Sequence, residues 1–198
     1  DMVARWIVYR ADHVLAKQII GLSGISKVCW LDLCCGCGEL GLAVGRISEL
    51  EKILCDETQD MLNLAQDYIG QSRLESRVKT LLGDVHEIPL ADESVNLAVS
   101  RGSMFFWEDR VQAFREIYRV LAIGGAAMIG GGFGNAELLR EIEIKMLKKD
   151  PEWKEKRQQR IGQSKVEEYR QELEQAGISS FEITRDEAGL WITISKTA

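Results

Sequence analysis

The sequence predicts an α/β fold: a doubly wound, mostly parallel sheet of seven strands, with helices on both faces and a C-terminal antiparallel hairpin strand. Three observations predict it. Short apolar runs alternate with helical segments over most of the chain, a glycine-rich turn follows the first run, and two closely spaced strand-like runs end the chain. Alternating strands and helices form right-handed crossovers and a parallel sheet, whereas adjacent strands with a short connection pair as a hairpin.

The first part of the chain contains most of the predicted sheet. Residues 4–20 place apolar side chains at helical spacing, and Gly21 and Gly24 end this pattern. Strand-like runs follow at residues 28–33, 52–55, 78–82, 95–100 and 126–130, with helical segments at 38–48, 59–70 and 109–121 between them. In such a sheet, ligands bind at the carboxyl ends of the parallel strands.

The last part of the chain changes character. Residues 135–176 are charged and helical, with interruptions at Asp150-Pro151 and Gly162, and strand-like runs follow at 178–184 and 190–196. The helical stretch is either a cap over a ligand pocket or a solvated connection. We favour the cap, because the stretch leaves the sheet at the edge where ligands bind.

The composition indicates one domain over residues 1–198. Hydrophobic residues make up 45% of the chain and charged residues 28%, as is typical of a globular protein. The 25 basic and 31 acidic residues give a net charge of −6 without a block of like charge, which disfavours a nucleic-acid or acidic-membrane surface. We see no run of about 20 apolar residues and no signal segment, so we expect a cytoplasmic protein with small-molecule partners.

The glycine turn after the first strand indicates the ligand. Gly36 and Gly38 let the backbone turn sharply and approach a ligand, and the next helix offers unpaired N–H groups. Asp32, at the end of the strand, would repel a pyrophosphate but would attract a cation. The turn therefore favours a sulfonium or ammonium ligand over a dinucleotide.

Three carboxylates are in phase with three strands. Asp32, Asp56 and Asp84 each lie at or just beyond a strand end, which brings them to one edge of the sheet. Like charges that gather there destabilise the fold unless a ligand satisfies them. Asp56 follows Asp32 by 24 residues, the spacing of an acid that binds ribose hydroxyls. Alternatively, Asp56 and Thr58 cap the next helix.

Three of the five cysteines crowd the same turn. The chain has five, namely Cys29, Cys34, Cys35, Cys37 and Cys55. No further ligand stands at a zinc spacing, and the two histidines, His13 and His86, are isolated, so we expect no metal. A disulfide from Cys34 or Cys35 to Cys55 is disfavoured in a reducing compartment. We therefore interpret these cysteines as small side chains beside a ligand.

Four motifs together resemble class I S-adenosylmethionine-dependent methyltransferases, which have a Rossmann-like fold. They are Leu31-Asp32-Leu33-Cys34-Cys35-Gly36-Cys37-Gly38, Cys55-Asp56-Glu57-Thr58-Gln59-Asp60-Met61-Leu62, Gly83-Asp84-Val85-His86-Glu87-Ile88-Pro89 and Arg119-Val120-Leu121-Ala122-Ile123-Gly124-Gly125. The similarity is greatest to the quinone-biosynthesis-like branch, which acts on small molecules. It implies methyl transfer from S-adenosyl-L-methionine to a small-molecule acceptor.

The resemblance also implies roles for single residues. In the glycine turn, the methionine end of the cofactor is held by Asp32, the backbone of Cys34 and Gly36, and the turn residue Gly38. Asp56 binds the ribose, with Glu57 and Met61 beside the adenosine. Asp84 and the Val85 N–H read the adenine, and the Ser100 region closes over the methionine amine. The chain departs from the family at Cys34, where many members have glycine, and at 122–125, where Ala-Ile-Gly-Gly replaces a Lys-Pro-Gly-Gly turn.

The resemblance divides the domain into four parts. We expect an N-terminal helical cap at 1–27, a cofactor-binding core at 28–131, a helical cap or connection at 132–176 and a C-terminal hairpin at 177–198.

The acceptor side rests on the residues after the fourth strand. Arg101 can pair with an anionic acceptor, while Phe106 and Trp107 can wall an apolar or aromatic one. Packing under the next helix is the alternative, as probable as the pocket for Phe105 and slightly less so for Trp107. Tyr9 is expected to close the pocket. The glycines at 130–134 indicate either close approach to a ligand or a hinge.

The sequence assigns no catalytic residue. His86 is the candidate for a general base, but it lies in the adenine motif, so we favour a cofactor-side or surface position. The segments after strands four and five resemble a compact subgroup of methyltransferases from anaerobic prokaryotes, which indicates a donor but no acceptor. Two alternatives remain: a non-catalytic module that binds S-adenosylmethionine, and an NAD-dependent oxidoreductase, which the carboxylate before the turn disfavours.

Overall fold

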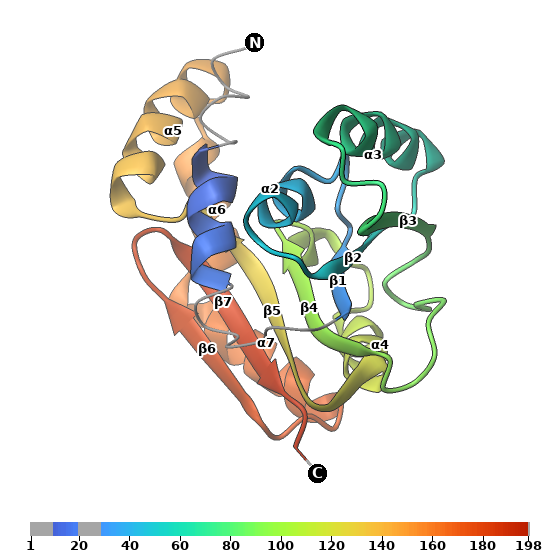
Figure 1. Ribbon diagram of the computed structural model, residues 1–198. Coiled ribbons are helices and arrows are strands. Elements are labelled where there is room, and N and C mark those ends of the chain that lie inside the picture. Colours follow the sequence, from blue (N-terminus) through green and yellow to red (C-terminus); the bar gives the residue numbers. More distant parts are fainter. Residues whose placement is uncertain (1–9, 20–28, 198) are drawn as a thin grey trace.

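A seven-stranded sheet with helices on both faces forms the protein (Figure 1). This computed structural model describes residues 10–19 and 29–197. The strands are β1 (Cys29–Leu33), β2 (Glu51–Asp56), β3 (Val78–Leu82), β4 (Val95–Arg101), β5 (Leu121–Gly132), β6 (Phe181–Arg185) and β7 (Gly189–Ser195). After a helix at residues 10–19, the helices are α2 (Glu39–Ile47), α3 (Gln59–Ser72), α4 (Arg110–Val120), α5 (Ala136–Lys149), α6 (Trp153–Ile161) and α7 (Gln163–Gln175), with a short 3-10 turn at Met104–Phe106.

The strand order β3-β2-β1-β4-β5-β7-β6 confirms the predicted fold class. Strands β1 to β5 are parallel, and β7 inserts antiparallel between β5 and β6. From β1, in the middle of the sheet, the strands follow one another to the edge at β3. The chain then returns to the middle with β4 and continues to the other edge, so the ends of β1 and β4 lie side by side. This switch point is where ligands bind in open α/β sheets.

Alternate residues of β1 pack into two different cores. Trp30 joins Leu15 and Ile19 of the helix at 10–19 and the apolar face of α2. Leu31 and Leu33 face the other way, into the larger core formed by α4, α7 and the C-terminal strands. Because successive side chains of a strand point to opposite faces, a strand such as β1, which is buried on both faces, requires helices on both sides.

The charged stretch forms α5, α6 and α7, with breaks where the sequence predicts them. Asn135 begins α5 by accepting a hydrogen bond of 2.9 Å from the Leu138 N–H, and Asp150-Pro151 ends the helix. Helix α7 packs on α4, whereas α5 and α6 pack on each other above the β6–β7 hairpin (Figure 1).

Two strands begin three or more residues away from the predicted position. β5 begins at Leu121 rather than 126, because Leu121 already pairs with Val95 of β4. Residues 122–125 bulge out before the next pair, Leu97 with Ala126, and Gly124 keeps a left-handed turn there (φ +80°). β6 begins at Phe181 rather than 178, because Ile178 donates its N–H to the Leu173 carbonyl and completes the end of α7.

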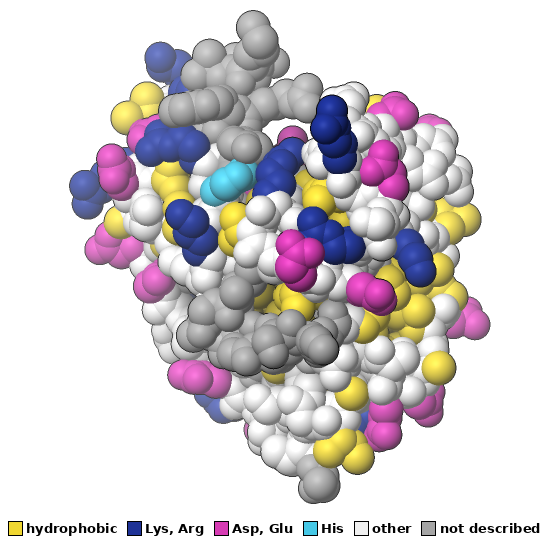
Figure 2. Space-filling model, viewed as in Figure 1, with side chains coloured by type: hydrophobic (Ala, Val, Ile, Leu, Met, Phe, Trp, Pro, Cys, Tyr) yellow, Lys and Arg dark blue, Asp and Glu magenta, His cyan; other side chains and the backbone are white. Residues whose placement is uncertain are grey.

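Acidic and basic side chains are interspersed on the face seen in Figure 2, as the charge pattern of the sequence predicts. None of the helices in the described part of the chain has the length and apolar character needed to cross a bilayer.

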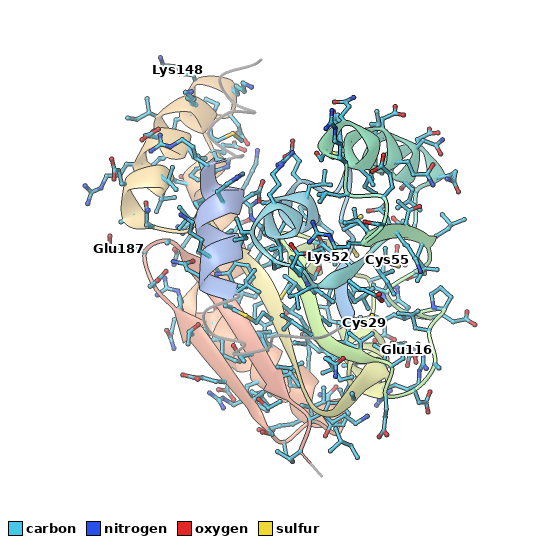
Figure 3. The ribbon with its side chains drawn as sticks, in the orientation of Figure 1. Cys29, Lys52, Cys55, Glu116, Lys148 and Glu187 are labelled. Carbon is cyan, nitrogen blue, oxygen red and sulfur yellow. The ribbon has the colours of Figure 1, made fainter. Side chains whose placement is uncertain are left out.

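A buried lysine lies at the amino ends of the strands. Lys52, at the start of β2 (Figure 3), is buried and donates to the carbonyl of Leu50, and burial lowers its pKa to about 8. A cavity of only about 70 Å³ lies beside it. The larger cavities are found at the carboxyl ends of the strands.

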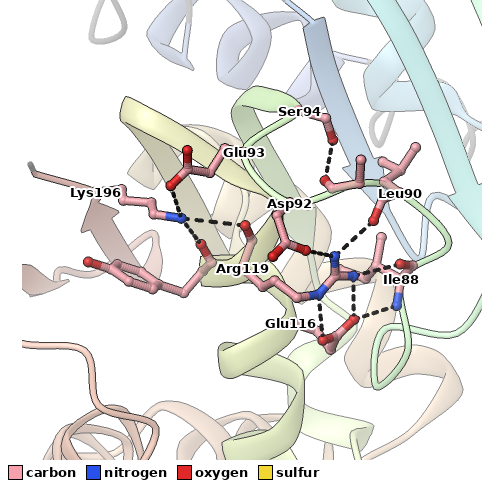
Figure 4. A network of polar contacts seen from close by, with 10 residues as sticks. Ile88, Leu90, Asp92, Glu93, Ser94, Glu116, Arg119 and Lys196 are labelled. Carbon is pink, nitrogen blue, oxygen red and sulfur yellow. Dashed lines mark hydrogen bonds and ion pairs between the residues drawn. The ribbon is translucent and has the colours of Figure 1, made fainter.

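The loop after β3 is fixed by an arginine on α4 (Figure 4). Arg119 donates to the carbonyls of Ile88 (2.8 Å) and Leu90 (2.9 Å) and pairs with Glu116 and Asp92. Glu116 in turn accepts from the Ile88 N–H at 2.9 Å. One side chain thereby satisfies several backbone groups of a loop that has no sheet partner.

Candidate active site

The chain makes a tight turn between β1 and α2. Cys34 (φ +54°), Gly36 (φ +56°) and Gly38 (φ +79°) all have left-handed backbone. A Cβ at Gly38 would lie 2.6 Å from Leu54 Cδ1, so glycine lets α2 pack on β2. A Cβ at Gly36 would meet no described atom within 4 Å. One glycine therefore serves packing, while the other borders open space.

That open space is a cavity of about 300 Å³, here called the turn cavity. Four residues predicted to bind the cofactor line it: Asp32, Cys34, Gly36 and Met61. The other lining residues, which the sequence analysis did not assign to the cofactor, are Asp12, Cys35, Cys37, Glu39, Leu40 and Arg101.

Two buried carboxylates face the turn cavity. The exposed fractions of Asp12 and Asp32 are 1% and 3%, and the Oδ2 atom of each has no hydrogen-bond partner among the described residues. Burial raises the pKa of Asp32 to about 7 and that of Asp12 to about 6. A Cβ at Gly41 would lie 3.0 Å from Asp32 Oδ2, so this glycine makes room for the carboxylate. Buried acceptors without donors fit a cationic ligand group.

Arg101 connects Asp12 to the rest of the site. Its guanidinium pairs with Asp12 Oδ1 and donates from Nε to the Gly132 carbonyl at 3.3 Å. Arg101 lines both the turn cavity and a second, larger cavity.

Asp56 supports the turn from β2. Its Oδ2 accepts from the Gly36 N–H at 2.8 Å and its Oδ1 from the Thr58 N–H at 3.0 Å. The second bond satisfies a backbone donor at the start of α3, as the helix-capping alternative requires. The first fixes the open glycine of the turn, so the carboxylate also shapes the ligand cavity.

Asp84 follows β3, beside Asp56. The Gly83 N–H donates to the Asp56 carbonyl at 3.0 Å, which joins the two strand ends. Asp84 Oδ1 accepts from the His86 N–H at 2.8 Å, and this bond lowers the pKa of Asp84. The His86 ring lies between Asp84 (2.6 Å from Nδ1) and the Asp109 N–H (3.4 Å from Nε2). His86 therefore lies in the loop after β3 and lines neither large cavity.

The remaining predicted cofactor residues differ in accessibility. Glu57 is exposed, and the Val85 side chain is buried in the main core, which leaves only its backbone for a ligand. Ser100 is fully buried and donates to the Leu33 carbonyl at 2.9 Å, so its side chain joins the ends of β1 and β4 and does not line the turn cavity.

The second cavity, here called the α6 cavity, has a volume of about 470 Å³. Its walls come from the segments after β4 and β5 and from α5 and α6. Phe105, Phe133 and Trp153 supply aromatic surface, and the Phe133 and Trp153 rings lie 6.0 Å apart between centroids. A volume of this size accepts a small molecule.

The aromatic residues expected at the acceptor are arranged differently in the structure. Phe105 lines the α6 cavity, whereas Phe106 is 65% exposed and lies under the Arg160 guanidinium, 4.6 Å from its ring centroid. Trp107 is only 7% exposed and packs edge-on against Phe114. Trp107 is thus a core residue, which corrects its expected place at the acceptor. Tyr9 lies outside the described residues.

The glycine run after the predicted fifth strand forms the end of β5 itself. Gly130, Gly131 and Gly132 belong to β5 and pair with β7. A Cβ at Gly130 would lie 2.2 Å from the Leu190 carbonyl oxygen, and one at Gly131 would lie 2.7 Å from the Phe105 ring. The run therefore lets β7 and Phe105 approach the end of β5. Gly131 and Gly132 also line the α6 cavity, which agrees with the expected close approach to a ligand and not with a hinge.

Three of the cysteines, Cys34, Cys35 and Cys37, line the turn cavity, whereas Cys29 lies at the other end of β1. All five lie in the described part of the chain, and none forms a disulfide with another described residue. Burial raises the pKa of Cys34 to about 11 and that of Cys55 to about 12, which keeps both protonated at neutral pH. Within residues 10–19 and 29–197, no three His, Cys, Asp or Glu side chains are arranged to hold a metal ion.

Asp12 was readable from the sequence but was missed. It lies next to Ala11 and three or four residues before Leu15 and Ala16, so helical spacing puts it on the buried stripe. A carboxylate at an apolar position of an amphipathic helix indicates a buried ion pair or a ligand.

The fold and the site together define a class. A doubly wound sheet with a C-terminal hairpin, a glycine turn after β1 and carboxylates at the ends of β1, β2 and β3 are the features of a class I methyltransferase. A family model described as a methyltransferase domain matches residues 31–125. A solved structure from Methanococcus maripaludis, described as a candidate S-adenosyl-L-methionine-dependent methyltransferase, is 40% identical with a TM-score of 0.95 and covers 100% of this chain and 90% of that chain. The chain belongs to the family of S-adenosyl-L-methionine-dependent methyltransferases.

Curated relatives match a smaller part of the chain. A demethylmenaquinone methyltransferase of Lactiplantibacillus plantarum is 34% identical over 96 residues, which are 48% of this chain and 40% of that protein. An arsenite methyltransferase of Halobacterium salinarum is 27% identical over 139 residues, 70% of this chain and 34% of that protein. The chain thus spans less than half the length of these two relatives, and the acceptors in their names belong to those proteins.

Proposed function

We propose that the protein transfers a methyl group from S-adenosyl-L-methionine to a small-molecule acceptor, with the donor in the turn cavity and the acceptor in the α6 cavity. One observation carries the assignment of the donor cavity. Two buried carboxylates, Asp12 and Asp32, line a cavity bordered by a glycine turn, and one oxygen of each has no hydrogen-bond partner among the described residues. A zwitterionic ligand with an ammonium group supplies the missing donors.

The chain itself acts by positioning. When bound, the cofactor supplies a methyl group that a positive sulfur has already activated, so no protein nucleophile is required. Asp32 and Asp12 hold the cationic end, Asp56 fixes the turn and accepts from the ribose, and Asp84 accepts from the adenine amino group. By holding the donor in line with the acceptor, these residues would supply the positioning that the methyl transfer needs.

We further propose that α5 and α6 form the cap over the acceptor. Met146 of α5 and Trp153 of α6 line the α6 cavity opposite Phe105. Apolar walls on opposite sides exclude water, which strengthens the attraction between a nucleophile and a sulfonium. Acidic and basic side chains are mixed on the surface, which favours a small-molecule acceptor over a nucleic-acid partner. The buried free thiols favour a cytoplasmic protein.

Titration calorimetry tests the donor site. We expect S-adenosyl-L-methionine and S-adenosyl-L-homocysteine to bind at micromolar concentration and NAD⁺ not to bind. Asp84→Ala should weaken both by about 1–3 kcal/mol, because a hydrogen bond to the adenine is lost. Asp67→Ala, at an exposed position on α3, is the matched control and should leave affinity unchanged.

Turnover then tests the reaction. Release of S-adenosyl-L-homocysteine that depends on an added acceptor supports methyl transfer. Unaltered cofactor affinity in Asp84→Ala, or binding of NAD⁺ in place of the sulfonium, would contradict the assigned site.

A further inference from the structure

Positive side chains are concentrated on one wall of the α6 cavity. Arg101, Lys156, Arg157 and Arg160 line it, and Asp150 is the one acidic lining residue. Lys156, Arg157 and Arg160 all belong to α6, within little more than one turn. A cavity built only for a neutral acceptor has no need of this charge.

The ion pairs separate these cations into two groups. Arg101 pairs with Asp12, and Lys156 pairs with Asp150 at 2.8 Å. By contrast, Arg157 and Arg160 have no carboxylate within 4 Å among the described residues. Two guanidinium groups at i and i+3 therefore face the cavity without a counter-charge.

The acid that acts on these two groups, Asp186, does so on Arg157 from beyond ion-pairing distance. Arg157 Nη2 donates to the Glu187 carbonyl, 2.7 Å away, at the β6–β7 turn (Figure 3), which fixes the guanidinium without neutralising it. Burial and charge repulsion from the nearby Arg185 lower the pKa of Arg157, and Asp186 raises it by attraction. Arg160 stacks on Phe106, and this contact orients a guanidinium while leaving its edge free for an acceptor.

The other walls of the cavity are mostly apolar and include aromatic rings. Phe105 approaches the glycine backbone of β5 on one side, and Phe133 with Trp153 forms the other. Aromatic walls of this kind bind a planar ring, whereas guanidinium groups bind an oxyanion with two parallel hydrogen bonds.

We propose that the methyl acceptor is an anionic aromatic compound, whose carboxylate or other oxyanion is bound by Arg157 and Arg160 while its ring lies between Phe105 and Trp153. This inference rests on the proposed function and names the chemical class of its acceptor. The oxyanion is an anchor. Because its lone pairs are engaged by guanidinium groups, the methylated atom is a different one, on the ring side that faces Arg101 and the turn cavity.

A matched pair of probes tests the proposal. The full chain, saturated with S-adenosyl-L-homocysteine, is titrated with 2-naphthoate and with 2-naphthamide, which have the same ring but differ in charge. We expect naphthoate to bind about tenfold more tightly, since one charge-assisted hydrogen bond contributes at least that factor. A phosphate ester, 2-naphthyl phosphate, shows whether a larger oxyanion is preferred.

Variants show whether the two arginines carry the preference. Arg157→Gln and Arg160→Gln, alone and together, should each reduce naphthoate affinity, and the double variant should bind the two probes within about threefold of each other. Arg140→Gln, at an exposed position of α5, is the control and should keep the tenfold preference. Unchanged S-adenosyl-L-homocysteine affinity shows that each variant is folded.

The possible failures are distinguishable. Absence of S-adenosyl-L-homocysteine binding in the unaltered protein would overturn the proposed function. Normal cofactor binding with equal affinity for both probes, or a naphthoate preference that survives in the double variant, would overturn the anionic acceptor alone.

Discussion

Asp32 destabilises the unliganded protein, and in the proposed function its charge binds the cofactor. Its carboxylate is buried beside a second acid, and its Oδ2 lacks a partner among the described residues. Removing the charge should therefore stabilise the unliganded protein and weaken the liganded one. At pH 8 we expect Asp32→Asn to raise the melting temperature without ligand and to reduce S-adenosyl-L-homocysteine affinity by about 1–3 kcal/mol. A variant that loses both stability and affinity would contradict this role.

Cys34 has a conformation that suits glycine better. With φ at +54°, a side chain costs about 1–2 kcal/mol relative to glycine. The comparison of Cys34→Gly with Cys34→Ala isolates this term, because both variants lose the thiol. We expect the glycine variant to be more stable by about 1 kcal/mol in urea unfolding and both to keep their cofactor affinity, since only the backbone meets the ligand. Equal stability of the two would contradict backbone strain at this position.

At the scale of elements, the site depends on loops that are fixed by distant side chains. Arg119 of α4 holds the loop that carries Asp84 through two carbonyls and the Asp92 carboxylate, and Glu116 of the same helix pairs with its guanidinium. We expect Arg119→Gln to lower the free energy of unfolding by about 2 kcal/mol and to weaken cofactor binding, because the loop loses its charged donor. Arg115→Gln, on the same helix with one bond to the Gln175 carbonyl, should have a much smaller effect on both.

The same scale shows what the sequence could predict. Strands and helices followed from periodicity, and the turn at Gly36 and Gly38 followed from residues that only one backbone geometry favours. The aromatic residues did not follow. Met104–Phe106 form a 3-10 turn, which rotates successive side chains by about 120°, so neighbouring aromatics face different environments. Phe105 thus faces the α6 cavity while Trp107 packs in the core, a result that depends on α4 and not on the local pattern.

Tertiary pairing determined the other differences. The glycines of β5 are required by the backbone of β7, a strand about 60 residues later, and no local signal distinguishes this need from a hinge. The extension of β5 to Leu121 likewise depends on Val95 of β4. The three strand-end aspartates were readable because parallel strands end at one edge.

For the whole molecule, the buried acids predict a pH dependence. Burial raises the pKa values of Asp12 and Asp32 from 3.8 to about 6 and about 7, so their contribution to stability is present below about pH 4 and is lost as the pH rises through 6–7. A cationic ligand favours the ionised forms. We therefore expect the increase in melting temperature caused by S-adenosyl-L-homocysteine to be larger at pH 7.5 than at pH 5.5. In Asp32→Asn this difference should shrink, and an increase independent of pH in the unaltered protein would contradict the prediction.

Arg101 borders two chambers at once, and this has a thermodynamic consequence. Whatever changes the position or the counter-charge of its guanidinium on one side alters the free energy of an occupant on the other. Such coupling is reciprocal: the factor by which a donor improves the affinity for an acceptor equals the factor by which the acceptor improves that for the donor. In the proposed function, Arg101 between the two cavities thus makes the affinity for each substrate depend on whether the other is bound.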